Sequence, residues 1–450
     1  MTGTRHAPPT LGFIELFRMI PLMRRHTLQS FTALTHRFGH IVRFKGLWTS
    51  FLLTHPHDIE HVLQTNARNY HKGRSYRVIK SATGNGLFVS EGDFWRRQRR
   101  LAQPAFHHQR IASFAQIMTN STEEMLCDWR RSFARDEALE IVPEMMKLTL
   151  RIVGQTLFST DLIEEAAAMG RMLNVGRDYA IRRMWQLIKL PESFPTRENR
   201  LYREAMREGD RVVYNMIKER RSGAKKDAGD LLALLMEARD EGTGEGMSDK
   251  QLRDEAITIM VAGNDTTATA LSWTWYLLAR HADVEQKLHA ELAAVLAGRT
   301  PTFEDLPNLK YTAMVIQEAL RLYPPAWILG RMAIDEDEIG GFSIPAKSEI
   351  MLHTYMTHRH TDFWDEPEKF DPERFLPERS TMRLRYSYFP FGGGPRQCIG
   401  NNFALMEAQL ILATVAQKYQ LRLVSDQLIY PEASVTLRPR GEMLMKLHAA

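Results

Sequence analysis

The sequence predicts a mainly α-helical protein with small β-sheets, which is an α+β fold class. Apolar residues recur with the helical period over most of residues 58–420, and polar turns separate the segments. Runs of β-branched and aromatic residues are short and local, and no βα alternation indicates a parallel sheet. We expect residues 1–450 to form a single domain, with residues 1–35 set apart as an N-terminal segment.

Short strands are expected in three places. The first is residues 40–54, where β-branched and aromatic runs are broken by Gly46. The others are residues 341–352 and the stretch between 421 and 448. Helices are therefore expected to dominate the chain, and the sheets to stay small.

The composition narrows the class of protein. A hydrophobic content of 44% and a charged content of 25% are typical of a globular chain, neither disordered nor fibrous. Two cysteines, Cys127 and Cys398, argue against a disulfide framework and suit a reducing cytosol. A net charge of +5 permits acidic partners and does not require nucleic acid. We expect a cytoplasmic protein that does not bind nucleic acid.

Residues 1–25 are the one stretch that looks like a targeting or membrane segment. Glu15 and Arg18 interrupt its apolar residues, so the run is shorter than the ~20 residues that span a bilayer. No small-residue cleavage site follows an apolar core. We expect no transmembrane anchor, and contact of an amphipathic helix with a membrane surface stays open.

A long helical segment that begins near Ser248 carries an unusual polar stretch. Ser248 and Gln251 are placed to form a capping box at its start. Gly263 lies in its middle, although Gly costs about 1 kcal/mol against Ala in a helix. A mid-helix hydroxyl such as that of Thr266 can bond the carbonyl one turn back. A local bulge beside Thr266 and Asp265 is suited to water or a small oxygen ligand, and a kinked core helix is the alternative.

The segment FPFGGGPRQCIG, residues 389–400, surrounds one of the two cysteines with glycines. Glycines let backbone amides approach closely, because no Cβ stands in the way. Arg396 adds a fixed positive charge, which favours the thiolate of Cys398 over the thiol. The segment therefore predicts a loop that holds one sulfur anion against a flat or bulky group.

Two further segments are weak signals on their own. Glu318 and Arg321 share one helix face, and the following Pro324 and Pro325 stop that helix. Most such pairs are exposed and contribute little to stability. Residues 363–375 are rich in proline and aromatic residues, which predicts a packed coil whose Arg374 docks onto an acidic partner; an ordered surface loop is the alternative.

A basic helix is expected around residues 92–106. Trp95 and Arg99 lie on one face and offer an indole N–H and a guanidinium together, which suits a carboxylate or a phosphate. Arg96, Arg97 and Arg100 extend the positive charge, and a solvated basic face is the alternative.

Taken in order, these segments resemble the cytochrome P450 family of haem-thiolate monooxygenases, from roughly residue 38 to near the C-terminus. The matching positions are Phe391, Gly392, Gly394, Arg396, Cys398 and Gly400 in the cysteine loop, residues 262–267 in the long helix, Glu318, Arg321 and Arg374 in the structural triad, and Trp95 and Arg99 in the helix that holds the propionates. The resemblance implies the cytochrome P450 fold, with the long central helix over the haem.

The resemblance also implies a cofactor and a mechanism. The cofactor would be haem b (iron protoporphyrin IX), with Cys398 as the axial metal ligand and Phe391 packed against its sulfur. Thr266 would hydrogen-bond dioxygen or its water, and Asp265 would relay protons. The residues expected to pair with the propionates are Arg396, Trp95, Arg99 and Arg331.

The expected substrate is a hydrophobic small molecule, because the positions that would line the pocket are apolar or small. They are Leu87, Phe88, Val261, Ala262, Ala326, Trp327, Ile328 and Leu329. Plain core packing is the alternative for each. The amino-acid sequence of the cysteine loop and of the long helix favours fatty-acid or alkane hydroxylation, and terpenoid or steroid hydroxylation stays open.

Electrons are expected from a separate protein, since no flavin or nicotinamide segment follows the motifs. A ferredoxin or flavodoxin with its NAD(P)H reductase would dock on Arg96, Arg97 and Arg100. The alternatives are a peroxide-driven or redox-neutral haem-thiolate enzyme and a non-catalytic haem carrier or sensor. A zinc site of His353, His358 and His360 is disfavoured, because their loop lacks cysteine and helical spacing.

Overall fold

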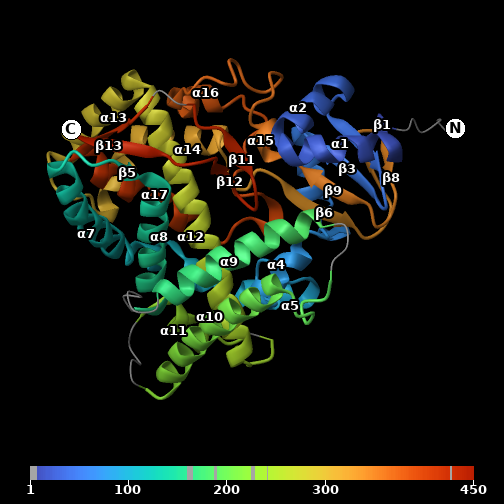
Figure 1. Cartoon of the computed structure of the whole chain (residues 1–450), viewed down its shortest axis with the longest axis horizontal. Helices are drawn as coiled ribbons and strands as arrows, with labels where there is room; N and C mark the ends of the chain where they lie inside the picture. The colour runs from blue at the N-terminus through green and yellow to red at the C-terminus, as the bar shows by residue number, and fades with distance from the viewer. Residues whose placement is uncertain (1–7, 160–165, 187–189, 224–228, 241, 426–427) are drawn as a thin grey trace. The chain divides into compact units, whose positions relative to one another are not determined.

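The computed structural model describes residues 8–450 except 160–165, 187–189, 224–228, 241 and 426–427 (Figure 1). The first seven residues of the N-terminal segment thus lie outside the described residues. The chain divides into two compact units, and each is described by itself. Unit 1 comprises residues 8–77, 320–370 and 374–398, and unit 2 comprises residues 78–319, 371–373 and 399–450.

Unit 1 is built around a mixed six-stranded sheet with the strand order β1-β2-β3-β9-β6-β4. The strands are β1 (Thr10–Leu11), β2 (Ile41–Lys45), β3 (Thr49–Leu53), β4 (Tyr70–Lys72), β6 (Leu329–Ala333) and β9 (Glu349–Leu352). Strand β3 pairs with β2 in antiparallel and with β9 in parallel orientation, so N-terminal strands lie beside strands from the last third of the chain (Figure 1). Phe51, Leu52 and Leu53 are fully buried, which makes β3 the centre of this sheet.

Short elements surround the sheet of unit 1. They are α1 (Phe13–Arg25), α2 (Thr27–Phe38), α3 (Pro56–Glu60), the π-helix η1 (His61–Thr65), η2 (Ala67–Asn69), β7 (Asp337–Ile339), β8 (Phe342–Ile344), α15 (Thr354–Thr357), α16 (Pro377–Ser380) and η6 (Gly394–Arg396). Helix α1 has no buried residue and exposes Phe13, Ile14 and Phe17. Among the described residues, no helix combines the length and the apolar character needed to cross a membrane.

Unit 2 is mostly helical. Its helices are α5 (Gly92–Ala102), η3 (Gln103–Phe106), α6 (His108–Ala112), α7 (Ala115–Ala134), α8 (Ile141–Phe158), α9 (Ala166–Trp185), α10 (Arg197–Arg221), α11 (Leu231–Glu237), α12 (Asp249–Arg280), α13 (Ala282–Leu296), η4 (Phe303–Asn308) and α17 (Asn401–Ala416). Its strands are β5 (Leu139–Glu140), β10 (Tyr419–Leu423), β11 (Pro431–Ala433), β12 (Leu437–Pro439) and β13 (Leu444–Ala449). Three elements contribute residues to both units: α4 (Tyr76–Thr83), α14 (Lys310–Leu322) and η5 (Pro372–Phe375).

Helix α12 is the centre of unit 2. It packs against α8, α10 and α17, and all its side chains from Leu271 to Leu278 are buried, so it is covered on every side there. Asn264 fixes its position against α8: its amide nitrogen donates to the carbonyl oxygen of Met146 at 2.8 Å and to the hydroxyl of Thr149 at 3.1 Å. This contact sets which residues of α12 face the neighbouring helix.

The local predictions for these elements are confirmed where they can be compared. The fold is mainly helical with small sheets, and the expected strand regions contain β2, β3, β8, β9, β10 and β13. The capping box forms, because the Gln251 side chain accepts from the Ser248 backbone N–H at 2.7 Å and the Ser248 hydroxyl accepts in return. Helix α14 ends at Leu322, just before the two prolines.

Candidate active site

The cysteine loop of unit 1 owes its shape to its glycines. Gly392 and Gly394 have positive φ angles of 68° and 63°, which residues with a Cβ rarely adopt. A Cβ on Gly394 would lie 1.8 Å from the carbonyl oxygen of Leu63, so the backbone approaches η1 as only glycine allows. The Cys398 backbone N–H donates to the carbonyl oxygen of Phe391 at 3.0 Å, and the Cys398 side chain is exposed.

Sequence reasoning missed the buried support of this loop. The ring of His358 is fully buried and accepts at Nε2 from the backbone N–H of Phe389 at 2.9 Å. Burial holds the pKa of His358 well below its usual range, so the ring is neutral and can accept. Arg321 donates to the carbonyl oxygens of His358, Pro367 and Lys369 at 2.8, 2.7 and 3.1 Å. The arginine of the predicted triad therefore supports the segment on which the cysteine loop rests.

The other two triad residues also bind backbone. Glu318 is fully buried and accepts from the backbone N–H of Asp371 at 3.0 Å. Arg374 is buried and donates to the carbonyl oxygens of Asp365 and Glu366. These contacts hold the coil that was predicted from its prolines and aromatic residues.

Arg331 of β6, an expected partner of the propionates, and the remaining positions of the cysteine loop lie in different surroundings. Arg331 is buried within the sheet of unit 1, and its guanidinium donates to the carbonyl oxygen of Gly330 at 2.9 Å. Phe391 and Arg396 are half-buried in unit 1, and Gly400 precedes α17 in unit 2.

Helix α12 in unit 2 carries the predicted acid and alcohol. The Thr266 hydroxyl donates to the carbonyl oxygen of Ala262 one turn back at 2.6 Å, as the sequence indicated. The expected bulge is wrong, because α12 is α-helical throughout its length. The contacts of the buried Asn264 with α8 hold the regular helix next to Gly263. Ala262 is exposed and Val261 is half-buried, as are Asp265 and Thr266 on the same stretch of helix.

Asp265 forms an ion pair that the sequence did not reveal. Its carboxylate pairs with the guanidinium of Arg438 in β12 and accepts from the hydroxyl of Thr436 at 2.7 Å. Both partners come from the C-terminal hairpin, more than 170 positions away. The carboxylate is therefore engaged by a guanidinium and a hydroxyl of the same hairpin.

A second acid lies behind the same helix. Glu407 of α17 is fully buried, and this burial raises the pKa of its carboxyl to about 8. The Thr267 hydroxyl opposes the shift. Glu407 is thus a neutral carboxylic acid at pH 7. Its neighbour on α12 is Thr267, the residue that directly follows Thr266.

The loop with Leu87 and Phe88 is fixed to the first turns of α12. The backbone N–H of Leu87 donates to the carboxylate of Glu255 at 3.0 Å, and that of Asn85 donates to Asp254 at 2.8 Å. Burial raises the pKa of Glu255 to about 7. Leu87 is half-buried and Phe88 is exposed, so both are available at the surface of this loop.

The candidate pocket residues after α14 differ in burial. Trp327 is buried and packs edge-on against the ring of His353, with centroids 5.4 Å apart, so its indole belongs to the core of unit 1. Ala326, Ile328 and Leu329 are half-buried. His353 is fully buried in this packing, and His360 lies elsewhere beside His40.

Trp95 and Arg99 share a basic hollow of about 730 Å³ on unit 2. It is lined by Trp95, Arg96, Arg99, Arg100, Gln103, Pro104, His107, Gln109 and Arg110. A tryptophan beside several guanidiniums is suited to an anionic group, and binding of such a group by Trp95 and Arg99 stays a prediction.

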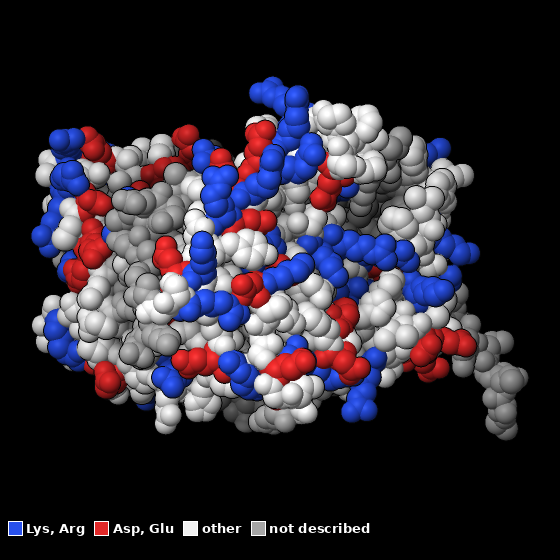
Figure 2. Space-filling view, turned by 90° about the horizontal axis from the view of Figure 1, so that it is seen from below, with Lys and Arg blue, Asp and Glu red and all other residues white. Residues whose placement is uncertain are grey.

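Acidic side chains offset part of this charge. Arg96 pairs with Asp93, and both Arg97 and Arg100 pair with Asp240. Figure 2 shows basic and acidic side chains interspersed over the displayed face. Arg97 lines a different hollow, together with Arg221, so the three arginines predicted to form one basic face do not all line one surface.

The residues fit a haem group on two grounds. An exposed cysteine sits in a loop whose glycines leave no room for side chains, and a basic arginine precedes it. Acid and alcohol groups adjoin an exposed alanine of α12. The cysteine loop belongs to unit 1, and the acid and alcohol belong to unit 2, so each set is described by itself.

The model of the family described as cytochrome P450 matches residues 8–445 of this chain. The chain belongs to the cytochrome P450 family. Members are haem-dependent monooxygenases, so this cytochrome P450 uses dioxygen, electrons from a redox partner and a hydrophobic substrate.

Curated relatives agree with this family. The chain is 38% identical over 446 residues to cyclooctatin synthase of Streptomyces melanosporofaciens, which covers 98% of this chain and 94% of that protein. It is 38% identical over 424 residues to cyclooctat-9-en-7-ol 5-monooxygenase of the same organism, covering 94% and 90%. It is 33% identical over 436 residues to pentalenene oxygenase of Streptomyces avermitilis, covering 95% and 94%.

A solved structure has the same fold. The crystal structure of the cytochrome P450DA heme domain aligns with a TM-score of 0.90 at 25% identity, over 99% of this chain and 97% of that one. The predicted family and the predicted fold class are both confirmed.

Proposed function

We propose that this cytochrome P450 hydroxylates a terpenoid, with one oxygen atom from dioxygen and with electrons from a separate ferredoxin or flavodoxin. The similarity to relatives named for cyclooctat-9-en-7-ol and for pentalenene carries the proposal. It replaces the preference for fatty acids and alkanes that the motifs suggested. Half-buried apolar positions such as Leu87, Val261 and Ile328 are compatible with such a substrate.

The proposed cofactor is haem b, which supplies the activation of dioxygen when it is bound. Cys398 is the proposed metal ligand, and the glycine loop and the buried His358 keep its sulfur in place. Phe391 would shield that sulfur from water. Proposed partners of the propionates are Arg396, Arg331, Trp95 and Arg99.

The proposed proton path runs through α12. The Thr266 hydroxyl holds a proton at Oγ1 for dioxygen, and Asp265 replenishes that proton after its carboxylate leaves Arg438. Breaking the ion pair costs free energy, so the relay is closed while Asp265 stays paired. This arrangement favours an oxygen-dependent enzyme over a haem carrier, which needs no acid and alcohol.

A substrate screen tests the terpenoid proposal. Purified ferric enzyme is titrated with pentalenene, cyclooctat-9-en-7-ol, lauric acid and palmitic acid, and the low-spin to high-spin absorption change is recorded. We expect saturable shifts with the terpenoids and hydroxylated products that require both dioxygen and an electron donor. Shifts and products with the fatty acids alone would overturn the proposed substrate class, and products formed without dioxygen would overturn the proposed reaction.

The proposed docking surface for an acidic redox partner consists of the exposed arginines of the hollow at α5 and α6, whereas the half-buried Trp95 and Arg99 are assigned to the propionates. Arg96, Arg100 and Arg110 line it, whereas Arg97 lines another hollow. A partner with acidic groups opposite these guanidiniums associates faster, and the increase in the association rate constant is largest at low salt.

Neutralising two of these residues tests the docking surface. The double variant Arg96→Gln/Arg110→Gln should raise KM for reduced ferredoxin severalfold and flatten its dependence on ionic strength. Arg97→Gln, on the same helix but outside the hollow, is the matched control. Equal kinetics in both variants would place docking elsewhere.

A further inference from the structure

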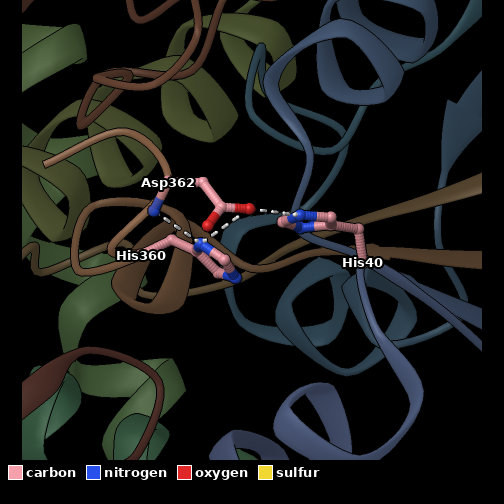
Figure 3. A group of neighbouring side chains, drawn as sticks. All are labelled: His40, His360 and Asp362. Atoms are coloured by element: carbon pink, nitrogen blue, oxygen red, sulfur yellow. Dashed lines mark hydrogen bonds and ion pairs between the residues drawn. The ribbon is translucent and has the colours of Figure 1, made fainter.

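Two histidines and an aspartate of unit 1 converge far from the cysteine loop in sequence. His40 directly precedes β2, and His360 and Asp362 follow α15 (Figure 3). His40 Nε2 lies 3.2 Å from Asp362 Oδ2, and His360 Nδ1 lies 3.6 Å from the same oxygen. The three ligand atoms all lie within 4.8 Å of one another, and no other group of three His, Cys, Asp or Glu residues in the described chain meets this criterion.

Hydrogen bonds orient both imidazoles. His40 Nδ1 and the Thr54 hydroxyl oxygen are 3.0 Å apart, and the hydroxyl can accept from a protonated Nδ1 while it donates to the carbonyl oxygen of His40 at 3.4 Å. A proton on Nδ1 leaves the lone pair of Nε2 directed at the Asp362 carboxylate. His360 Nδ1 accepts from the backbone N–H of Asp362 at 3.2 Å, so this nitrogen bears the lone pair of the ring, and a metal ion would take the place of that N–H.

These two imidazole nitrogens and the carboxylate oxygen lie close enough together to share one cation. Tetrahedral zinc with bonds of about 2.0–2.1 Å separates its ligand atoms by about 3.3 Å, close to the distances of 3.2 and 3.6 Å from the two imidazole nitrogens to Asp362 Oδ2. Two imidazoles and one carboxylate are a donor set that suits zinc, with water in the fourth position. The threonine–histidine hydrogen bond is of the kind that orients metal-bound imidazoles.

We propose that His40, His360 and Asp362 bind one Zn²⁺ ion, separate from any haem iron. The ion ties the start of β2 to the segment after α15, which lie 322 positions apart. Solvent reaches the site, because His40 also lines a surface hollow of about 430 Å³ together with His55, His57 and Asp58. A zinc ion bound only by the folded chain stabilises unit 1.

Zinc binding to the haem-loaded enzyme tests the proposal. The protein is treated with a chelator and desalted, iron and zinc are counted by mass spectrometry, and ZnCl₂ is then titrated against a fluorescent zinc chelator. We expect one zinc per chain beyond the iron, and a rise in melting temperature with zinc. Loss of a residue that hydrogen-bonds to a metal ligand typically weakens metal affinity by about 10–100-fold. His40→Ala and Asp362→Asn remove a ligand itself, so each should weaken zinc binding by more than this.

Two further variants complete the design. Thr54→Val keeps both imidazoles and should weaken zinc binding by about 10–100-fold. His448→Ala removes an exposed imidazole of β13 and should leave the affinity unchanged. Absence of a stoichiometric zinc, or wild-type affinity in Asp362→Asn, would overturn the proposal and leave a histidine–aspartate ion pair. Asp362 is exposed, so this variant remains informative if His40→Ala does not fold.

Discussion

Replacing Cys398 by alanine is expected to abolish both hydroxylation and the thiolate signature of the haem. Bound thiolate gives the ferrous carbon monoxide complex a red-shifted Soret band, and alanine has no sulfur to bind the iron. The fold should survive, because the loop is held by Gly394 against Leu63 and by the His358 ring at Phe389. The measurements are the carbon monoxide difference spectrum, the haem content and product formation.

Cys127→Ala is the matched control, since Cys127 is the only other cysteine of the chain and is also exposed. It should keep the wild-type spectrum and activity. A Cys398→Ala enzyme that retains the red-shifted band would remove Cys398 as the ligand. Far-ultraviolet circular dichroism separates loss of the ligand from loss of the fold.

Replacing Thr266 by alanine should separate electron consumption from product formation. The variant loses a hydroxyl whose one structural bond is to Ala262 within the helix, so haem and substrate binding should persist. Without a proton at Oγ1, dioxygen that has taken up two electrons and two protons leaves as hydrogen peroxide. We expect the amount of product formed per NADPH consumed to fall by at least about tenfold. This is less than the rate factor of about 10²–10⁴ that a positioned proton donor typically contributes.

Two other substitutions in α12 serve as comparisons. Ser272→Ala deletes an equivalent hydroxyl bond to the carbonyl of Ala268 on the same helix, and its coupling should stay at the wild-type level. Thr266→Ser keeps the hydroxyl and should recover most of the coupling. Unchanged coupling in Thr266→Ala would exclude Thr266 from proton delivery.

Features that depend on neighbours along the chain could be predicted from the sequence. The capping box of Ser248 and Gln251, the hydroxyl bond of Thr266 and the end of α14 before Pro324 each involve residues within four positions. Their residue types fix the local hydrogen bonds. The family resemblance extended this to the fold, because the order of the motifs is itself specific.

Features that depend on tertiary contact could not be predicted. The partner of Asp265 is Arg438 in a distant hairpin, and the partner of Phe389 is a histidine in another segment. No hydrophobic or polar periodicity in the sequence links residues so far apart. Taken alone, each of these side chains looks like any other residue of its type. The expected bulge at Gly263 failed for the same reason, since the contacts of Asn264 with α8 were not visible in the sequence.

The loop before α5 has a practical consequence for altering which molecules the enzyme accepts. A Cβ on Gly84 would come within 2.1 Å of the Asp254 carboxylate, and one on Gly86 within 2.1 Å of the Thr258 hydroxyl. Combinatorial mutagenesis that randomises these glycines would mostly yield misfolded clones. Diversity placed at Leu87 and Phe88, the two proposed pocket residues of this loop, leaves the backbone hydrogen bonds to Asp254 and Glu255 in place, so libraries confined to these two codons should retain members that fold.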